Sequence, residues 1–190
     1  MFLISQNIES YDVQLPDDAV FRINLAWCNS LQELENKLQK NKKKKFLIDL
    51  PIGRIKPPNN KYSLDGLLPI INENENIHYF AISNVESKDD LKPFLEKLPT
   101  RVNVIPKIES PQAINNIDDI CGELKNEEKI IMLDHDDLFS SIIRNNEDKE
   151  NFPNYIKKLI DFCSQNNISL LRTVGVMFSD DEKRVTQYEK

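Results

Sequence analysis

Charged side chains recur at the ends of short apolar segments, and their types suit binding of a metal ion and an anion. Lys107 and Glu109 lie at the end of the apolar segment 102–108, and Asp137 follows the apolar segment 130–133. Side chains two residues apart in a strand face the same side, so Lys107 and Glu109 would point together. Carboxylates from two successive strands, completed by water and substrate oxygens, suit Mg²⁺ or Mn²⁺. The sequence therefore predicts a divalent metal site on Glu109 and Asp137.

Polar residues at three further apolar segments extend this candidate site. They are Arg22 and Asn24 in the second segment, Asp49 in the third and Thr173 in the last. Arg22 and Lys107 would supply positive charge for a small carboxylate or phosphate substrate. Taken singly, such residues more often form structural ion pairs or helix caps. Their recurrence at successive strand ends is what favours a binding or catalytic role.

The apolar segments predict strands, and the polar segments between them predict helices. The strand segments, rich in Ile, Val, Leu and Phe, are 1–5, 19–27, 46–52, 78–85, 102–108, 130–133 and 169–178. The helix segments are 30–40, 63–72, 87–98, 110–125 and 153–166. Strands alternating with helices indicate a parallel sheet in one α/β domain, residues 1–190. Seven strands predict a TIM-type (β/α) barrel one strand short of eight, with its site at the carboxyl ends of the strands.

Composition argues against a nucleic-acid-binding protein and against a membrane protein. The net charge of −6 gives the chain no general attraction to nucleic acid or to an anionic membrane. No apolar run approaches the roughly 18 residues that a membrane helix needs. Cys28, Cys121 and Cys163 are widely spaced, which favours reduced thiols and a cytoplasmic location. Dinucleotide, P-loop and hydrolase-elbow motifs are missing from the sequence.

Six segments resemble, in order, the catalytic barrel of the pyruvate kinase family. They are Phe-Arg-Ile-Asn-Leu at 21–25, Phe-Leu-Ile-Asp-Leu at 46–50 with Gly-Arg-Ile-Lys at 53–56, the segment 80–87, Pro-Lys-Ile-Glu at 106–109 with the segment 113–120, the segment 131–138, and Thr173. The resemblance implies an enzyme, a transferase or lyase, that acts on phosphoenolpyruvate, pyruvate or a related 2-oxo acid.

The resemblance also implies a role for each residue of the candidate site. Glu109 and Asp137 would hold Mg²⁺ or Mn²⁺. Lys107 would neutralise the transferring phosphoryl group, and Arg22 would bind phosphate. Thr173 would contact the pyruvate moiety or assist protonation of its enolate. Asn24 and Asp49 would belong to a monovalent-cation pocket and to the substrate site.

Departures from the family pattern argue against ADP phosphorylation. Ala26 and Trp27 stand where the family has a potassium-binding Ser and a nucleotide-side His, and His135-Asp136 replaces Arg-Gly. Few residues separate Lys56 from Ser63, so the lid domain is absent. We also expect this chain to lack the family's eighth barrel strand and C-terminal domain. Two alternatives therefore stay open: a catalytically inactive binding or assembly protein, and a citrate-lyase-type aldolase, which also has Pro-Lys-Ile-Glu-Ser at this strand.

An incomplete barrel would leave the edges of its first and last strands unpaired. Unpaired backbone groups beside an apolar core are costly. We therefore expect a homodimer or a protein partner at these edges, unless the tail covers the gap with a short strand at 185–188.

Overall fold

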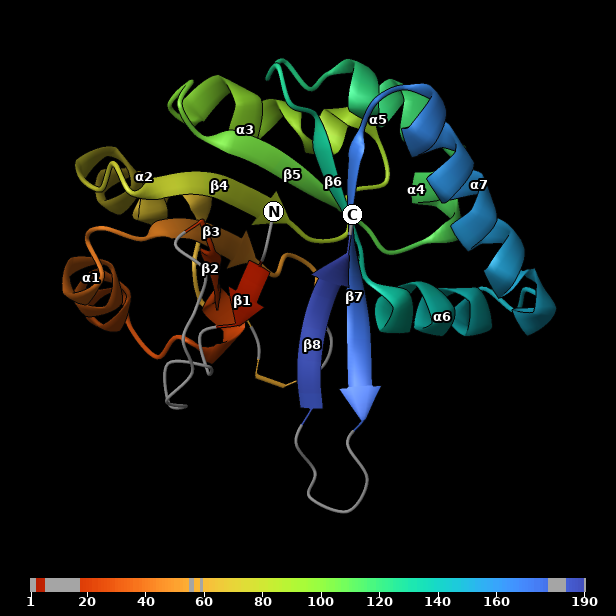
Figure 1. Ribbon diagram of the computed structural model, residues 1–190, viewed down its shortest axis with the longest axis horizontal. Helices are drawn as coiled ribbons and strands as arrows, with labels where there is room; N and C mark the ends of the chain where they lie inside the picture. Colours follow the sequence, from red (N-terminus) through yellow and green to blue (C-terminus); the bar gives the residue numbers. More distant parts are fainter. Residues whose placement is uncertain (1–2, 6–17, 55–56, 59, 178–183, 190) are drawn as a thin grey trace.

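The strands follow one another in chain order across a single curled sheet (Figure 1). The computed structural model describes residues 3–5, 18–54, 57, 58, 60–177 and 184–189. Within them the strands are β1 (Leu3–Ser5), β2 (Val20–Asn24), β3 (Lys45–Leu50), β4 (Ile77–Ile82), β5 (Asn103–Ile108), β6 (Ile130–Leu133), β7 (Ser169–Met177) and β8 (Arg184–Glu189). Neighbouring strands from β1 to β7 are parallel, whereas β8 runs antiparallel to β7. The parallel α/β architecture predicted from the sequence is thus confirmed.

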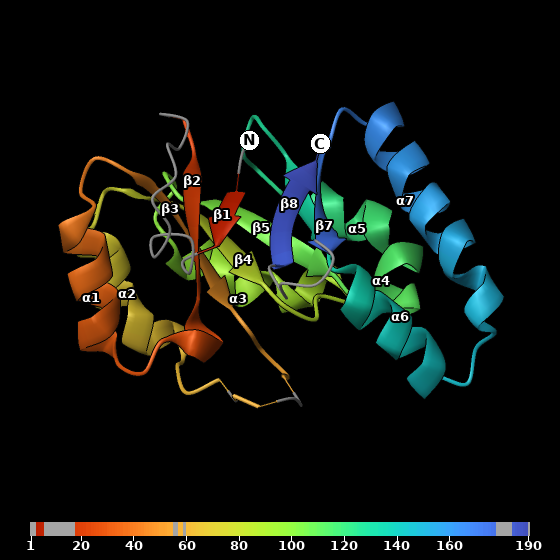
Figure 2. The same cartoon turned by 60° about the horizontal axis from the view of Figure 1, so that its bottom comes forward.

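The helices lie along the outer, convex side of this sheet (Figures 1 and 2). They are α1 (Leu31–Lys40), α2 (Leu64–Glu73), α3 (Lys92–Lys97), α4 (Pro111–Asn115), α5 (Ile117–Gly122), α6 (His135–Arg144) and α7 (Phe152–Gln165). Short 3₁₀ turns at Leu25–Trp27, Lys88–Asp90 and Lys149–Asn151 join them to their neighbours. No helix in the described residues has the length and apolar character required to cross a membrane.

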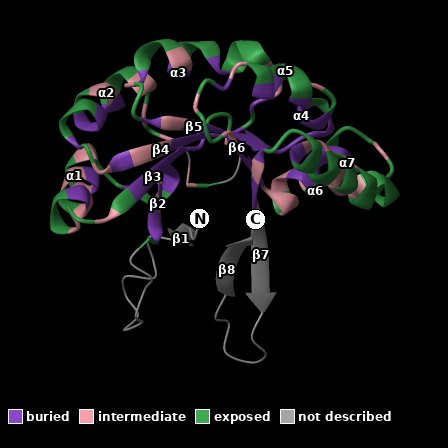
Figure 3. Cartoon of the chain, turned by 45° about the horizontal axis from the view of Figure 1, so that its top comes forward, coloured by how far each residue is buried: buried purple, intermediate pink, exposed green. Residues whose placement is uncertain are grey.

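Alternate residues of the strands enter two separate apolar clusters. The larger cluster lies between sheet and helices and includes Phe46 and Ile48 of β3 with Leu34 of α1 and Leu138 of α6. The smaller cluster contains strand residues alone: Val20, Leu47, Tyr79, Ala81, Ile105, Ile130, Met132 and Leu171. It therefore lies on the concave face, as a layer inside the curl of the sheet. Burial on both faces explains why the strand segments are so uniformly apolar (Figure 3).

The same alternation carries polar residues onto the concave face near the strand ends. Leu47 is followed two residues later by Asp49, and Ile105 by Lys107. Since side chains repeat with a period of two along a strand, these polar groups stand directly beyond the inner apolar layer. The register supports this arrangement, because Asn24 of β2 pairs with Asp49 of β3. The fold thus collects the polar residues at one edge of the sheet.

Several element boundaries differ from the sequence-based expectation. The second strand ends at Asn24, where the side chain of Asn24 accepts a hydrogen bond from the Ala26 N–H and begins a 3₁₀ turn. The single helix expected over 110–125 is two short helices that meet at Asn116. Helix α6 was not among the expected helices, because the polar residues after segment 130–133, Asp137 among them, were expected to lie at the end of a strand. They form instead the start of a helix that Asp134 caps.

Candidate functional site

An ion-paired triad of Arg22, Asp49 and Lys107 lies at the floor of the candidate site. Arg22 donates from Nε to Asp49 Oδ2 over 2.9 Å, and its terminal guanidinium nitrogen binds the same oxygen. Lys107 Nζ lies 3.9 Å from that oxygen. Asp49 Oδ1 accepts no hydrogen bond from any described residue. The Asp49 carboxylate is therefore held on one side by two cationic groups from strands β2 and β5.

Lys107 connects this triad to Glu109 and Ser83. Its ammonium lies 2.6 Å from Glu109 Oε1 and donates to Ser83 Oγ over 3.1 Å. The exposed fraction is 4% for Lys107, 3% for Glu109 and 0% for Asp49. Charges so removed from water are tolerated because each has an opposite charge beside it.

These neighbours determine the ionisation of the buried groups. Burial by itself lowers the pKa of Lys107, but the carboxylates of Asp49 and Glu109 outweigh it and raise that pKa above its ordinary value. Burial raises the pKa of Asp49, yet the charges of Lys107 and Arg22 outweigh this and lower it. Burial also raises the pKa of Glu109, and Lys107 offsets this only in part. Lys107 is therefore a fixed cation at neutral pH and not a neutral amine nucleophile.

Three carboxylates converge beside Lys107. One oxygen each from Glu109, Asp134 and Asp137 lies within 4.8 Å of the others. Asp134 Oδ2 is 4.0 Å from Lys107 Nζ, and Asp134 Oδ1 accepts from the Asp137 N–H over 3.3 Å. Glu109 directly follows strand β5, Asp134 is the N-cap of α6, and Asp137 lies in the first turn of that helix. Carboxylates gathered in this way match the oxygen ligands that Mg²⁺ and Mn²⁺ prefer.

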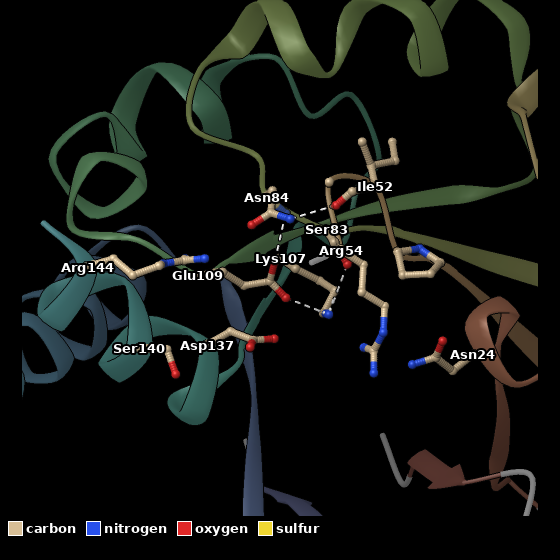
Figure 4. Close-up of a pocket in the computed structure, with 12 residues that line it drawn as sticks. Asn24, Ile52, Arg54, Ser83, Asn84, Lys107, Glu109, Asp137, Ser140 and Arg144 are labelled. Carbon is tan, nitrogen blue, oxygen red and sulfur yellow. Dashed lines mark hydrogen bonds and ion pairs between the residues drawn. The ribbon is translucent and has the colours of Figure 1, made fainter. Parts of the chain in front are cut away.

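A cleft of about 150 Å³ opens above these charges (Figure 4). It is lined by Asn24, Pro51, Ile52, Gly53, Arg54, Ser83, Asn84, Lys107, Glu109, Asp137, Ser140 and Arg144. Clefts for drug-sized ligands measure about 300–1,000 Å³, so this one suits a ligand of only a few heavy atoms. Asp137, Ser140 and Arg144 recur at helical spacing, and they give the cleft one polar wall from α6.

Most residues predicted from the sequence meet in this region. Glu109 and Asp137 come together as expected, and Asn24 lines the cleft while capping its own turn. Arg22 contacts Asp49, a pairing that the sequence analysis did not foresee. Thr173 lies within β7, and its side chain belongs to the part of the chain that the structure does not describe.

Three residues of the site were missed from sequence. Asp134 lies in the family-like segment 131–138, and Ser83 and Asn84 lie in the family-like segment 80–87, but no role was predicted for any of them. A signal for Ser83 did exist, because it follows Ala81 by two residues and so continues the concave-facing alternation. The signal for Asp134 was its place three residues before Asp137, the spacing of a helix N-cap.

Comparison with solved structures shows that the fold of this chain is similar to that of a known protein. No protein-family model and no curated protein matches this sequence. Among solved structures, the crystal structure of RipC from Yersinia pestis aligns with a TM-score of 0.56, over 86% of this chain and 72% of that chain. The aligned sequences are 16% identical. At this identity the likeness concerns the fold alone.

Proposed function

We propose that this chain is a divalent-metal-dependent enzyme acting on phosphoenolpyruvate, pyruvate or a related 2-oxo acid, on an open pyruvate-kinase-like (β/α) barrel. One observation carries the proposal: the carboxylates of Glu109, Asp134 and Asp137 converge within 4.8 Å beside the ammonium of Lys107. This combination offers oxygen ligands for a cation and a fixed positive charge for an anion in one small cleft.

The residues present fit Mg²⁺ or Mn²⁺. The donor set consists of carboxylate oxygens, and Asp134 and Asp137 are only partly buried, which leaves access for water and substrate. Glu109 is held in place by the Asn84 N–H, which donates to its Oε2 over 2.7 Å. When bound, the ion would supply the positive charge that polarises a substrate carbonyl.

Lys107 would act by electrostatics. Its ammonium is fixed by Ser83, Glu109 and the more distant Asp49, so it need not reorganise when negative charge develops on a substrate oxygen. Arg22 would hold Asp49 and add positive charge beneath the cleft. Thr173 stays, from the family resemblance, the proposed residue for contact with the pyruvate moiety or for protonation of its enolate.

The chemistry shared by these substrates is formation of an enolate, and this step can be measured without a second substrate. In D₂O with Mg²⁺, the chain should exchange the methyl protons of pyruvate, as followed by NMR. Because the carboxylates hold the ion, Glu109→Gln and Asp137→Asn should each lower the exchange rate by about 100-fold or more. Asp136→Asn is the matched control, since this exposed acid lies in the same helical turn but outside the carboxylate group.

The outcomes separate the proposal from its alternatives. Wild-type exchange no faster than that of free Mg²⁺ would contradict the enzymatic proposal. If calorimetry then still shows metal-dependent binding of oxalate, a mimic of the pyruvate enolate, the chain is a binding protein. Exchange together with carbon–carbon cleavage of a 3-hydroxy acid would favour the citrate-lyase-type alternative. That alternative draws support from Pro106 to Ser110, because this segment resembles the Pro-Lys-Ile-Glu-Ser of the citrate-lyase-type family.

A further inference from the structure

The loop after strand β4 forms hydrogen bonds with both Lys107 and Glu109 of the candidate site. Ser83 accepts from Lys107 through its hydroxyl, and the next residue, Asn84, donates from its backbone N–H to Glu109 Oε2 over 2.7 Å. The Asn84 side chain turns the other way. Its Nδ2 donates to the carbonyl oxygen of Ile52 over 2.6 Å, in the loop that follows β3 (Figure 4).

Asn84 makes these contacts from an unusual backbone conformation. Its φ is 55°, in the left-handed region that residues other than glycine seldom adopt. A glycine would enter this region at lower cost, but it has no amide to bind Ile52. Asparagine is among the few residues that tolerate the conformation and also supply a donor. The left-handed backbone and the bound side chain together fix the directions of the backbone N–H and of the side-chain amide of Asn84.

The opposing loop is shaped to receive this amide. Gly53 also has a positive φ, 67°, and a Cβ added there would lie 3.1 Å from Asn84 Nδ2. That separation is shorter than an unstrained contact. The two loops can therefore approach this closely because Gly53 has no side chain. Ile52, Gly53 and Arg54 line the cleft. Asn84, which holds Glu109, therefore also helps to set the position of this loop along the cleft.

We infer that Asn84 is a positioning residue that couples the metal ligand Glu109 to the substrate-facing loop 51–54. The inference rests on the proposed function for its metal and its substrate. The two contacts of Asn84 act separately: the backbone N–H sets the Glu109 carboxylate, and the side-chain amide sets the loop. Loss of the amide alone should therefore impair substrate binding and leave metal binding intact.

Asn84→Gly tests this separation, because it keeps the N–H and the backbone conformation but removes the amide. By calorimetry, its Kd for Mn²⁺ should stay within about 3-fold of wild type, while its Kd for oxalate on the Mn²⁺-loaded protein should rise about 10-fold, the effect of one lost hydrogen bond. Gly53→Ala should raise the Kd for oxalate in the same way, because its added Cβ would crowd the side-chain amide of Asn84. Asn167→Gly is the matched control, since Asn167 has a φ of 53° on an exposed turn and does not line the cleft.

Hydrogen–deuterium exchange of residues 50–54 gives a readout that needs no metal. Asn84→Gly and Gly53→Ala should both accelerate it, and Asn167→Gly should not. Unchanged exchange, or an oxalate affinity equal to that of Asn167→Gly, would overturn the inference, as would equal losses of Mn²⁺ and oxalate affinity. If the wild-type chain binds neither Mn²⁺ nor oxalate, the proposed function and the coupling both fail, whatever the exchange of the loop shows.

Discussion

Asp49 is the anion that compensates the positive charges of Arg22 and Lys107 at the floor of the site. It is fully buried, and both Arg22 and Lys107 face it. Neither cation comes from a neighbouring position in sequence: Arg22 precedes Asp49 by 27 residues, and Lys107 lies on a strand that is not adjacent to β3. The resemblance to pyruvate kinase implied that Asp49 belongs to a monovalent-cation pocket. In the structure its observed partners are the two basic side chains.

We expect Asp49→Asn to lower the free energy of unfolding by about 3 kcal/mol, because breaking a buried ion pair leaves a charge without its partner. Urea denaturation at neutral pH measures the change. Asp136→Asn, on the surface of α6, serves as the control and should change stability by less than about 0.5 kcal/mol. A loss below about 1 kcal/mol for Asp49→Asn would show that the triad contributes little to stability.

At the scale of single elements, the beginning of helix α1 can be tested with pH. Ser30 Oγ accepts from the Glu33 N–H over 3.1 Å, and Glu33 Oε2 accepts from the Asn29 N–H over 2.9 Å. The hydrogen bond from Lys37, followed by that from Asn29, lowers the pKa of Glu33 to about 2. A carboxyl with a lowered pKa adds stability above its ordinary pKa and loses it as the pH falls toward the lowered value.

Ser30→Ala should therefore cost about 1 kcal/mol at neutral pH, the usual effect of losing an N-cap. Glu33→Gln should cost less than about 1 kcal/mol, because the side chain is partly exposed to solvent. The difference between Glu33→Gln and wild type should shrink as the pH falls from 5 to 2. Thermal unfolding across this range, with Glu35→Gln as the control, would contradict the assignment if the difference stayed constant.

The elements also show which features the sequence could predict. The starts of the helices expected over 30–40, 63–72 and 110–125 were predicted correctly, because each start is marked by a serine whose side chain caps an N–H only three residues away. Helix α6 was missed because its acidic first turn also suits a metal site at the end of a strand. In the structure Asp134 and Asp137 do both: they begin the helix and face Glu109. The contact of Asn84 with Ile52 depends on two loops meeting in space, which no local pattern encodes.

At the scale of the whole molecule, the curl of the sheet brings its two ends near each other. Strand β1 contacts β8, although the described hydrogen-bonded order runs from β1 to β8 without closing. The short covering strand expected at 185–188 is confirmed as β8, Arg184–Glu189, which pairs antiparallel with β7 from Arg172 to Met177. The edge of β7 is therefore covered by the tail of the same chain. The homodimer or protein partner stays a prediction, now directed to β1 and β8.

Removal of residues 184–190 tests how much this covering strand matters. Without β8, the backbone N–H and C=O groups of β7 between Arg172 and Met177 lose their partners, and an uncovered strand edge promotes pairing with another chain. We expect the shortened chain to self-associate at micromolar concentration, as measured by light scattering, and to show a larger mass than the full chain. Removal of Lys190 alone is the control, because it leaves the paired residues of β8 in place. A shortened chain with the mass and the unfolding midpoint of the full chain would show that the edge of β7 needs no cover.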